Sequence, residues 1–458
     1  MRILIGRFCV AAFLLFISVL PAWLPAEKHP RSILPEDNPS RRQTDGKAQT
    51  RSPVEFQEHL IADGFTYSFG VQTADLDGDG DLDITAADAL PNNSLYWFEN
   101  DGSGTFSKHL IQKDDPERLE RHAIGDVDGD GRPDVVIVKN LFGDVLWFRN
   151  SGTPKDGQLW KRHEITKGKL KGAYDVALAD FDGDGDLDVA ASSWRLSNNF
   201  VWFENDGTPA DGEWTMRIIE ADVAETRMIR AADIDGDGDA DLVGAAREEP
   251  VICWFENSGD PARIGWKKHI IDGESVQPIH GELVDFDQDG DLDLVMALGM
   301  GFSGDPDAEQ LAWYENDGSP KIGAWKKHLI ESGLTGAFEA ATGDFDGDGD
   351  LDIVLTIWNG AGAVLWFENP GKSRAAWEKH VVKQPWRRAN QVITGDFDGD
   401  GRLDLAAGAE RGSNEVRWWS NVDATGPRHY VARRATSRIK IDGRLDEAAW
   451  KNARTFGR

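Results

Sequence analysis

The stretch GDFDGDGDLDIVLTIW, residues 343–358, decides how this chain folds. It places five aspartates and three glycines directly before an apolar, β-branched run. Carboxylates this close in sequence repel one another unless a cation neutralises them. The run that follows is typical of a buried strand. The stretch therefore predicts a cation-binding turn that leads into a β-strand.

The same pattern occurs seven times along the chain. The copies begin at Asp75, Asp126, Asp180, Asp233, Asp285, Asp344 and Asp396. Each is followed by an apolar run, a Trp-aromatic pair with a Gly/Asp/Asn turn, and usually a further short segment such as WKKHLI. Four short β patterns separated by turns are typical of one propeller blade. The predicted fold class is therefore all-β, a seven-bladed β-propeller.

The two ends of the repeat region predict how the ring closes. The seventh copy stops after RWWSN at Asn421 and lacks an outer strand, whereas FQEHLI, residues 56–61, stands alone before the first copy. We expect this N-terminal strand to complete the last blade and so remove a free seam. A solenoid is the alternative, but it would need polar caps and would not leave complementary fragments at its ends.

Composition divides the chain into four regions. Residues 1–26 carry Arg2 and Arg7 before an apolar stretch of about 13 residues, too short to span a membrane, and predict a signal peptide. Residues 27–55 predict a flexible leader, residues 56–423 the propeller, and residues 424–458 a separate basic segment. After export one cysteine, Cys253, remains, so no intrachain disulfide can form. We expect a secreted or extracytoplasmic monomer whose mature chain has no membrane span.

The net charge of the chain indicates which classes of partner it can bind. The formal net charge is −30, and because both terminal regions are basic, residues 56–423 are more acidic still. A surface this acidic argues against nucleic acid and anionic lipid as partners. It favours bound cations.

The chemistry of the repeated loop predicts calcium. Carboxylates at loop positions 1, 3, 5 and 9, with the backbone carbonyl of position 7, offer the hard oxygen ligands that calcium takes at about 2.4 Å, and magnesium fits this set less well. Glycine at position 6 permits the sharp turn. Arg132 and Arg402 replace Asp at position 7, where only the backbone is needed, and Gln288 replaces Gly at position 4.

We expect about seven structural calcium sites. The residues at positions 1, 3, 5, 7 and 9 are Asp75, Asp77, Asp79, Asp81 and Asp83; Asp126, Asp128, Asp130, Arg132 and Asp134; Asp180, Asp182, Asp184, Asp186 and Asp188; Asp233, Asp235, Asp237, Asp239 and Asp241; Asp285, Asp287, Asp289, Asp291 and Asp293; Asp344, Asp346, Asp348, Asp350 and Asp352; and Asp396, Asp398, Asp400, Arg402 and Asp404.

Three alternatives explain the loops less well. Asp-Gly hairpins that bind no metal do not need four acids at fixed offsets. Dockerin and EF-hand loops lead into helices, whereas these lead into strand-like runs. Thrombospondin-type calcium repeats are usually joined by disulfides, which this mature chain cannot form.

With these motifs in view, the repeats resemble FG-GAP or VCBS repeats, the blades of integrin-type and bacterial extracellular propellers. That resemblance implies a calcium site in the loop between the first and second strands of each blade. The segment RIKIDGRLDEAAW, within residues 424–458, resembles the opening of a family 9 carbohydrate-binding module. The chain holds only this opening, which is too short to bury a core of its own.

A tryptophan and a histidine also recur at fixed positions in most of the repeats. The tryptophans are Trp97, Trp147, Trp202, Trp254, Trp313 and Trp366, and we expect them to pack between blades. The histidines are His59, His109, His163, His269, His328 and His380, with Arg217 as the fourth in this series along the chain. A position that accepts arginine is not a metal ligand, so we expect structural hydrogen bonds there.

Ligand binding should occur where the repeats differ. Strand order puts the aspartate loops on one face and the variable links on the other, around the channel mouth. The candidate ligand-binding residues there are Arg121, His122, Asp175, Trp194, Arg195, His280, Glu339, Trp358 and Asn359. Aromatic planes beside charged and amide groups suit sugars, and an unspecialised solvated mouth is the simpler alternative.

Two functions compete for this face. The first is a noncatalytic binding or adhesion module for an extracellular glycan or a cell-surface protein. The second is a polysaccharide lyase or sugar dehydratase, in which Arg121, His122, Asp175, His280 and Glu339 serve as acids, bases or ligands for an eighth metal. Propeller folds support both kinds of function, and the sequence favours the noncatalytic one.

Overall fold

The computed structural model describes residues 54–89, 93–300, 304–323, 325–371 and 376–423. These residues belong to one compact unit, Thr50–Arg458. The expected signal peptide, nearly all of the expected leader and the segment that resembles a carbohydrate-binding module lie outside them. Within the described part of the chain, no helix has the length and apolar character needed to cross a membrane.

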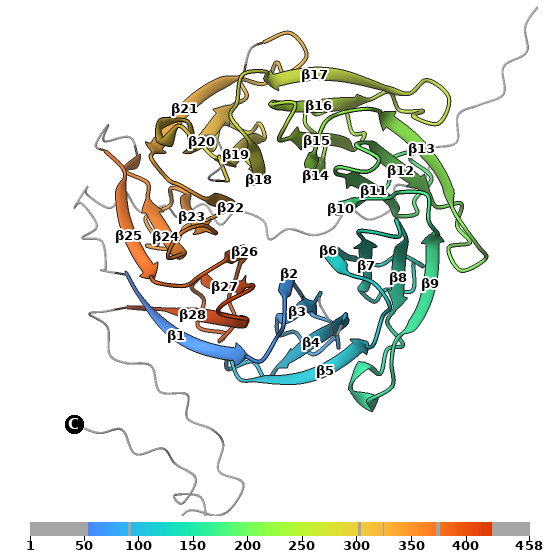
Figure 1. Cartoon of the computed structure of the whole chain (residues 1–458), viewed down its shortest axis with the longest axis horizontal. Coiled ribbons are helices and arrows are strands. Elements are labelled where there is room, and N and C mark those ends of the chain that lie inside the picture. Colours follow the sequence, from blue (N-terminus) through green and yellow to red (C-terminus); the bar gives the residue numbers. More distant parts are fainter. Residues whose placement is uncertain (1–53, 90–92, 301–303, 324, 372–375, 424–458) are drawn as a thin grey trace, which may run out of the picture. The chain divides into compact units, whose positions relative to one another are not determined.

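The described residues form 28 strands in seven antiparallel four-stranded sheets, blades 1 to 7 (Figure 1). Blades 1 to 3 are β2 (Ser68–Ala74), β3 (Asp83–Asp88), β4 (Ser94–Asn100) and β5 (Phe106–Gln112); β6 (Leu119–Gly125), β7 (Asp134–Lys139), β8 (Val145–Arg149) and β9 (Lys161–Thr166); and β10 (Ala173–Ala179), β11 (Asp188–Ser193), β12 (Phe200–Glu204) and β13 (Thr215–Glu220). Blades 4 and 5 are β14 (Thr226–Ala232), β15 (Asp241–Ala246), β16 (Val251–Asn257) and β17 (Trp266–Asp272); and β18 (Pro278–Val284), β19 (Asp293–Leu298), β20 (Gln310–Glu315) and β21 (Lys326–Ser332). Blades 6 and 7 are β22 (Ala337–Gly343), β23 (Asp352–Ile357), β24 (Ala363–Glu368) and β25 (Glu378–Lys383); and β26 (Ala389–Gly395), β27 (Asp404–Ala409), β28 (Glu415–Asp423) and β1 (Val54–Ala62). Two short 3-10 helices, η1 (Pro154–Asp156) and η2 (Pro306–Ala308), lie in links.

The blades form a ring whose centre is lined by the first strand of each blade, as Figure 1 shows. Short links force consecutive strands to be neighbours, so the chain runs outward through each blade and then begins the next. The aspartate loops and the turns after the third strands therefore share one face, here called the loop face. The links between second and third strands and those into the first strands share the other, here called the mouth face.

The ring closes with the N-terminal strand, as the sequence predicted. Strand β1 pairs antiparallel with β28, with Phe56 opposite Asn421 and Leu60 opposite Arg417. It begins at Val54, two residues earlier than expected. Pairing the first strand with the last gives the seventh blade its outer strand and leaves no gap between blades 1 and 7.

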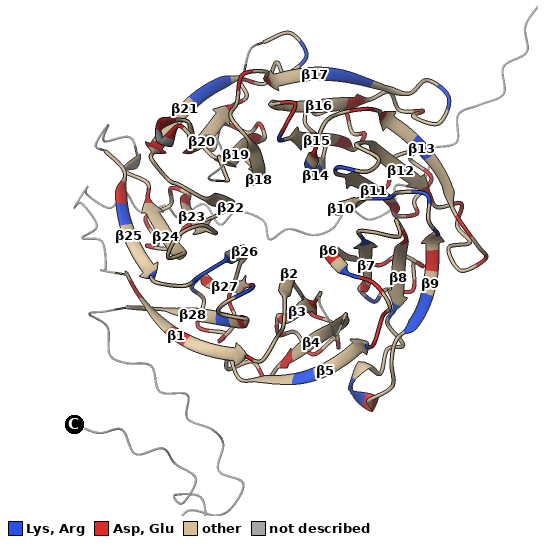
Figure 2. Ribbon diagram, viewed as in Figure 1, with Lys and Arg blue, Asp and Glu red and all other residues tan. Residues whose placement is uncertain are grey.

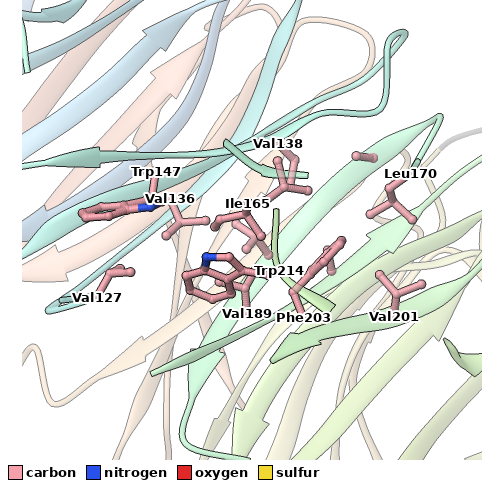
Figure 3. Close-up of a cluster of buried hydrophobic side chains, with 14 residues drawn as sticks. Val127, Val136, Val138, Trp147, Ile165, Leu170, Val189, Val201, Phe203 and Trp214 are labelled. Carbon is pink, nitrogen blue, oxygen red and sulfur yellow. The ribbon is translucent and has the colours of Figure 1, made fainter. Parts of the chain in front are cut away.

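The hydrophobic core lies between neighbouring blades. Figure 3 shows one such cluster, in which Val127, Val136, Val138 and Trp147 of blade 2 meet Val189, Val201 and Phe203 of blade 3. Burying one side chain of this size stabilises the fold by about 1.5–3 kcal/mol. The outermost strands carry the basic residues instead, and Figure 2 shows them along β5, β9, β17 and β25.

Candidate functional site

Each aspartate loop, numbered 1 to 7 by its blade, is shaped by its own backbone amides. In loop 3 the Asp180 carboxylate accepts hydrogen bonds from the backbone N–H groups of Gly183 at 2.8 Å, Asp184 at 3.2 Å and Gly185 at 2.9 Å. Gly183 and Gly185 have φ values of 76° and 99°, in the region that favours glycine. These bonds wrap the loop around the first carboxylate.

The position-9 aspartate fixes the loop to the blade. In loop 3 the Asp188 carboxylate accepts from the backbone N–H of Phe181 at 3.0 Å and of Asn205 at 2.7 Å, and its side chain is buried. Burial raises the pKa of this carboxyl group to about 7 in Asp83, Asp134, Asp188, Asp241, Asp293 and Asp404, and to about 8 in Asp352. A cation beside such a carboxylate lowers its pKa again.

Of the four carboxylates that the sequence predicted to converge, those at positions 1, 3 and 9 come together. Carboxylate oxygens from positions 1, 3 and 9 lie within 4.8 Å of one another in loops 1 to 4. A calcium ion with oxygen ligands at 2.3–2.6 Å fits between oxygens at roughly that separation. The donor set is all oxygen and mostly anionic, so the residues present fit calcium.

The position-7 side chain turns away from this group. It lies under the glycine of the turn that follows the third strand, where a Cβ added to Gly102 would be 2.4 Å from the Asp81 carboxylate. Gly207 meets Asp186 in the same way, at 2.9 Å. That contact helps to explain why the turn after the Trp-aromatic pair carries glycine in blades 1 to 6, a point the sequence alone did not explain.

Loop 5 keeps its shape although Gln288 replaces glycine at position 4. Gln288 has φ of 62°, the same left-handed region that glycine occupies at position 4 in the other loops. Its side-chain amide donates to the backbone carbonyl of Gly349 in loop 6. The substitution therefore costs some backbone strain and adds one contact between loops.

An asparagine that the sequence analysis did not single out bonds to the preceding blade in blades 1 to 5 and in blade 7. The Asn150 side chain donates to the backbone carbonyl of Leu76, in loop 1, at 2.7 Å. The equivalent bonds run from Asn100 to Phe397, Asn205 to Val127, Asn257 to Phe181, Asn316 to Ile234 and Asn421 to Phe345. The signal was present in the sequence, because an asparagine follows all seven Trp-aromatic pairs at the same offset.

The recurring tryptophans and histidines are structural, as predicted. Trp97 is fully buried and stacks on His109, with ring centroids 4.6 Å apart. The His109 ring nitrogen lies 2.8 Å from the Glu99 carboxylate. The same stack recurs in blade 4 between Trp254 and His269 at 4.4 Å. These pairs hold the third strand against the fourth.

The centre of the mouth face holds a buried ion-pair network. Arg121 donates to both carboxylate oxygens of Glu339, at 2.7 and 2.6 Å, and to Asp175 at 3.0 Å. Arg230 donates to the other Asp175 oxygen at 2.7 Å. Burial alone would lower the pKa of Arg121, but the carboxylates of Glu339 and Asp175 raise it above its usual value. Strands of blades 2, 3, 4 and 6 are thus joined across the ring.

The two candidate histidines lie beside this network and are also buried. His122 faces the Thr85 hydroxyl at 2.6 Å, and burial together with Arg121 lowers its pKa to about 3. His280 lies 3.2 Å from the Tyr174 hydroxyl, and burial, then Arg121, lower its pKa well below the usual value. Both rings are therefore neutral at physiological pH.

An aromatic cluster fills the mouth above these groups. It consists of Tyr67, Phe69, Ala89, Tyr174, Ile279, Met300 and Phe338, with Trp194 and Trp358 packed against it. Four of its members directly precede Gly70, Asp175, His280 and Glu339, which occupy the same position in the first strands of blades 1, 3, 5 and 6. Reading one position earlier in each repeat would have found them.

Guanidinium groups cover the two tryptophans expected to offer flat surfaces. The Arg195 and Arg227 side chains each lie 4.1 Å from the centre of the Trp194 ring. Arg388 lies 3.4 Å from the Trp358 ring, whose N–H donates to Glu410.

The nine candidate ligand residues therefore separate into two groups. Arg121, His122, Asp175, His280 and Glu339 are buried and have partners on neighbouring blades. Trp194, Arg195, Trp358 and Asn359 are partly or fully exposed to solvent at the mouth. A pocket of about 320 Å³ lies elsewhere, on the loop face between loops 6 and 7, and includes Asp344 and Arg402 in its lining.

Comparison with solved structures finds similar chains at low identity. The chain resembles a lectin of Agrocybe aegerita that recognises non-reducing terminal N-acetylglucosamine, with 19% identity, 78% of this chain and 86% of that chain covered, and a TM-score of 0.49. It also resembles BBS1N, solved in complex with ARL6DN (12%, 80% and 96% covered, 0.49), and YCF48 from Cyanidioschyzon merolae (12%, 80% and 98% covered, 0.49). Likenesses this distant carry no argument about function.

Sequence comparison identifies the repeats themselves. No curated protein matches the chain. The model of the FG-GAP-like repeat matches residues 75–137, 126–191, 233–296, 285–355 and 344–407. These five matches cover more than half of the sequence, and each runs from the aspartate loop of one blade through that of the next. The chain belongs to the FG-GAP-like repeat family.

Proposed function

We propose that the protein is a secreted propeller that binds calcium in its aspartate loops and uses its mouth face as a noncatalytic binding surface for extracellular glycans. Secretion rests on the apolar stretch within residues 1–26, which predicts a signal peptide. The observation that carries the rest is the contrast between the loop face, built by repetition, and the mouth face, where the blades differ.

Calcium binding is supported by the preformed loops. Backbone amides already orient the position-1 carboxylate, and the oxygens of positions 1, 3 and 9 lie within 4.8 Å of one another in loops 1 to 4. A bound calcium ion neutralises the clustered charge and cross-links the start of the loop to the second strand of its blade. Its role is structural.

The noncatalytic character is supported by the state of the mouth carboxylates. A general acid or base must come within hydrogen-bond reach of the substrate proton. Asp175 and Glu339 are 2% and 4% exposed and are paired with Arg121. Both candidate histidines are buried as well. The groups that a lyase would need are thus committed to holding the ring together.

Glycan binding is supported by the residues that remain exposed at the mouth. Arg195 leaves 60% of its side chain exposed above Trp194, and Arg411 leaves 55% exposed beside Tyr67. Asn359 lies next to Trp358 on the same face. Guanidinium and amide groups over aromatic rings supply donors for hydroxyl or carboxylate oxygens and apolar area for a sugar ring.

A glycan array tests this surface. We expect the calcium-loaded protein to bind a subset of glycans, and expect Arg195→Ala and Trp358→Ala each to reduce that binding at least tenfold. Arg263→Ala is the matched control, because Arg263 is an exposed arginine in a turn on the loop face. Binding that survives both mouth substitutions would rule out this face. Turnover of an acidic polysaccharide to an unsaturated, absorbing product would rule out the noncatalytic role.

A further inference from the structure

Blade 2 differs from its neighbours directly after the Trp-aromatic pair. The residue there is Glu99, Glu204, Glu256, Glu315 and Glu368 in blades 1 and 3 to 6. In blade 2 it is Arg149, at the end of β8. The change replaces a negative charge at the edge of the aspartate loop with a positive one.

Arg149 turns into the loop. Its Nε lies 2.5 Å from a carboxylate oxygen of Asp128, and its Nη2 lies 3.0 Å from a carboxylate oxygen of Asp130. These are positions 3 and 5 of loop 2. Arg132, at position 7, also pairs with Asp130. Two guanidinium groups therefore contact the carboxylates on which a calcium ion would depend.

The hydrogen bonding of His163 reflects the same replacement of glutamate by arginine. In blades 1 and 4 the equivalent histidines face the glutamate, with His109 2.8 Å from Glu99 and His269 2.6 Å from Glu256. Arginine cannot accept a hydrogen bond, and the buried His163 Nε2 has no hydrogen-bond partner among the described residues. Arg149 is thus directed at the loop and not at the histidine.

Loops 1 and 4 also receive a basic side chain, but in a different way. Lys155 lies 2.5 Å from Asp77 of loop 1 and 2.8 Å from Glu99. Lys321 lies 2.6 Å from Asp235 of loop 4 and 2.9 Å from Glu256. Each lysine comes from the next blade and also has a glutamate outside the loop, to which it can stay paired when the loop carboxylates turn to a metal.

Arg149 has no such alternative. Within the described residues both of its ion pairs lie inside loop 2, because Arg149 itself replaces the outside glutamate. Guanidinium stays protonated at any physiological pH, and its planar fork fits two carboxylates. Calcium in this loop would have to displace a fixed cation and then lie next to it, which like-charge repulsion opposes.

We propose that loop 2 takes no calcium and is held by Arg149 as a built-in cation, while the other six loops, which have glutamate or serine at this position, bind the metal. The inference rests on the proposed calcium binding. It makes the sites of the ring unequal, and it places a permanent contact at loop 2, next to the blade-1 loop to which Asn150 is bonded.

Calcium content measured by elemental analysis, after dialysis against excess calcium and removal of free ion, tests this directly. We expect the natural chain to hold one calcium ion fewer than its seven loops. Arg149→Glu and Arg149→Gln should each gain one ion, since both remove the guanidinium. Glu315→Arg is the reciprocal variant, because Glu315 faces Lys326 as Arg149 faces Lys161, and it should lose one.

Each outcome decides the question. Seven ions in the natural chain, or no gain in both Arg149 variants with unchanged circular dichroism, would overturn the role of Arg149 and leave calcium binding intact. If no variant holds calcium at all, the proposed calcium binding is itself wrong and the inference falls with it. A larger rise in melting temperature on calcium addition for Arg149→Gln than for the natural chain would support the inference without reference to ion counts.

Discussion

The two faces of the ring handle charge in different ways. On the loop face the same carboxylates recur in every blade, and in most loops their charge exceeds that of any basic side chain shown to contact them. On the mouth face each blade contributes a different residue, and Arg121, Asp175, Arg230 and Glu339 neutralise one another across the centre. Under the proposed function the loop face takes cations from solution, whereas the mouth face is compensated by the chain itself.

This difference shows which role the variable positions of a repeat protein serve first. A closed ring needs identical contacts between blades, and the repeated asparagine and tryptophan supply them. The centre of the ring is the one place where all blades meet, so residues there must differ to be complementary. Variable positions near the centre therefore serve packing and charge pairing before any ligand, and only the outer part of the mouth stays free.

Removing metal should produce the largest effect, and only through the loop face. With EDTA we expect the melting temperature to fall by roughly 10–20 °C, because each occupied loop contributes about 2.7 kcal/mol at a hundredfold excess of calcium. Calorimetry with and without added calcium measures this.

The matching control is magnesium, which should restore little of the lost stability because the loop is not a tight octahedron. Unchanged melting in EDTA would show that the loops are stable without metal and would remove the contrast between the faces.

Much of the loop face was predictable and most of the mouth was not. The repeat length, the glycine positions and the offsets between carboxylates recur along the chain. The seven copies therefore predicted the blades and the closing strand β1. They also predicted that Asp180, Asp182 and Asp188 converge. The pairing of Arg121 with Glu339 joins residues 218 positions apart, in blades that are not neighbours. Such a pair depends on which side chains extend across the centre of the ring. The repeat pattern carries no information about those contacts.

The mouth network should give the second largest effect. Arg121→Met leaves the carboxylates of Asp175 and Glu339 buried without their main partner, and removing one side of a buried ion pair costs about 3–5 kcal/mol. Denaturant unfolding at saturating calcium measures the loss. Calcium content should stay unchanged, because no loop residue contacts Arg121 among its described partners.

Arg195→Met is the matched control for that variant. Arg195 is also an arginine of the mouth face with a carboxylate partner, Glu225 at 2.8 Å, but 60% of its side chain is exposed. Exposed pairs contribute about 0–1 kcal/mol. If both substitutions cost the same, the centre of the mouth is open to water and its carboxylates become available for chemistry again.

The smallest effect is expected for the asparagine that links neighbouring blades. Asn150→Ala removes the bonds from the Asn150 side chain to the carbonyls of Leu76, at 2.7 Å, and Pro133, at 3.2 Å, and leaves buried acceptors unpaired. That loss costs about 1–3 kcal/mol. Ser151→Ala is the control, because this neighbour is exposed and bonds only within its own turn in the described structure.

Both variants are compared by urea unfolding with calcium present and absent. Because the Leu76 carbonyl belongs to loop 1, a link that acts between blades should also weaken calcium binding there, so the cost of Asn150→Ala should be larger with calcium than without it. An equal cost in both conditions would mean that the asparagine supports only its own turn, and that the blades are held together by their apolar contacts alone.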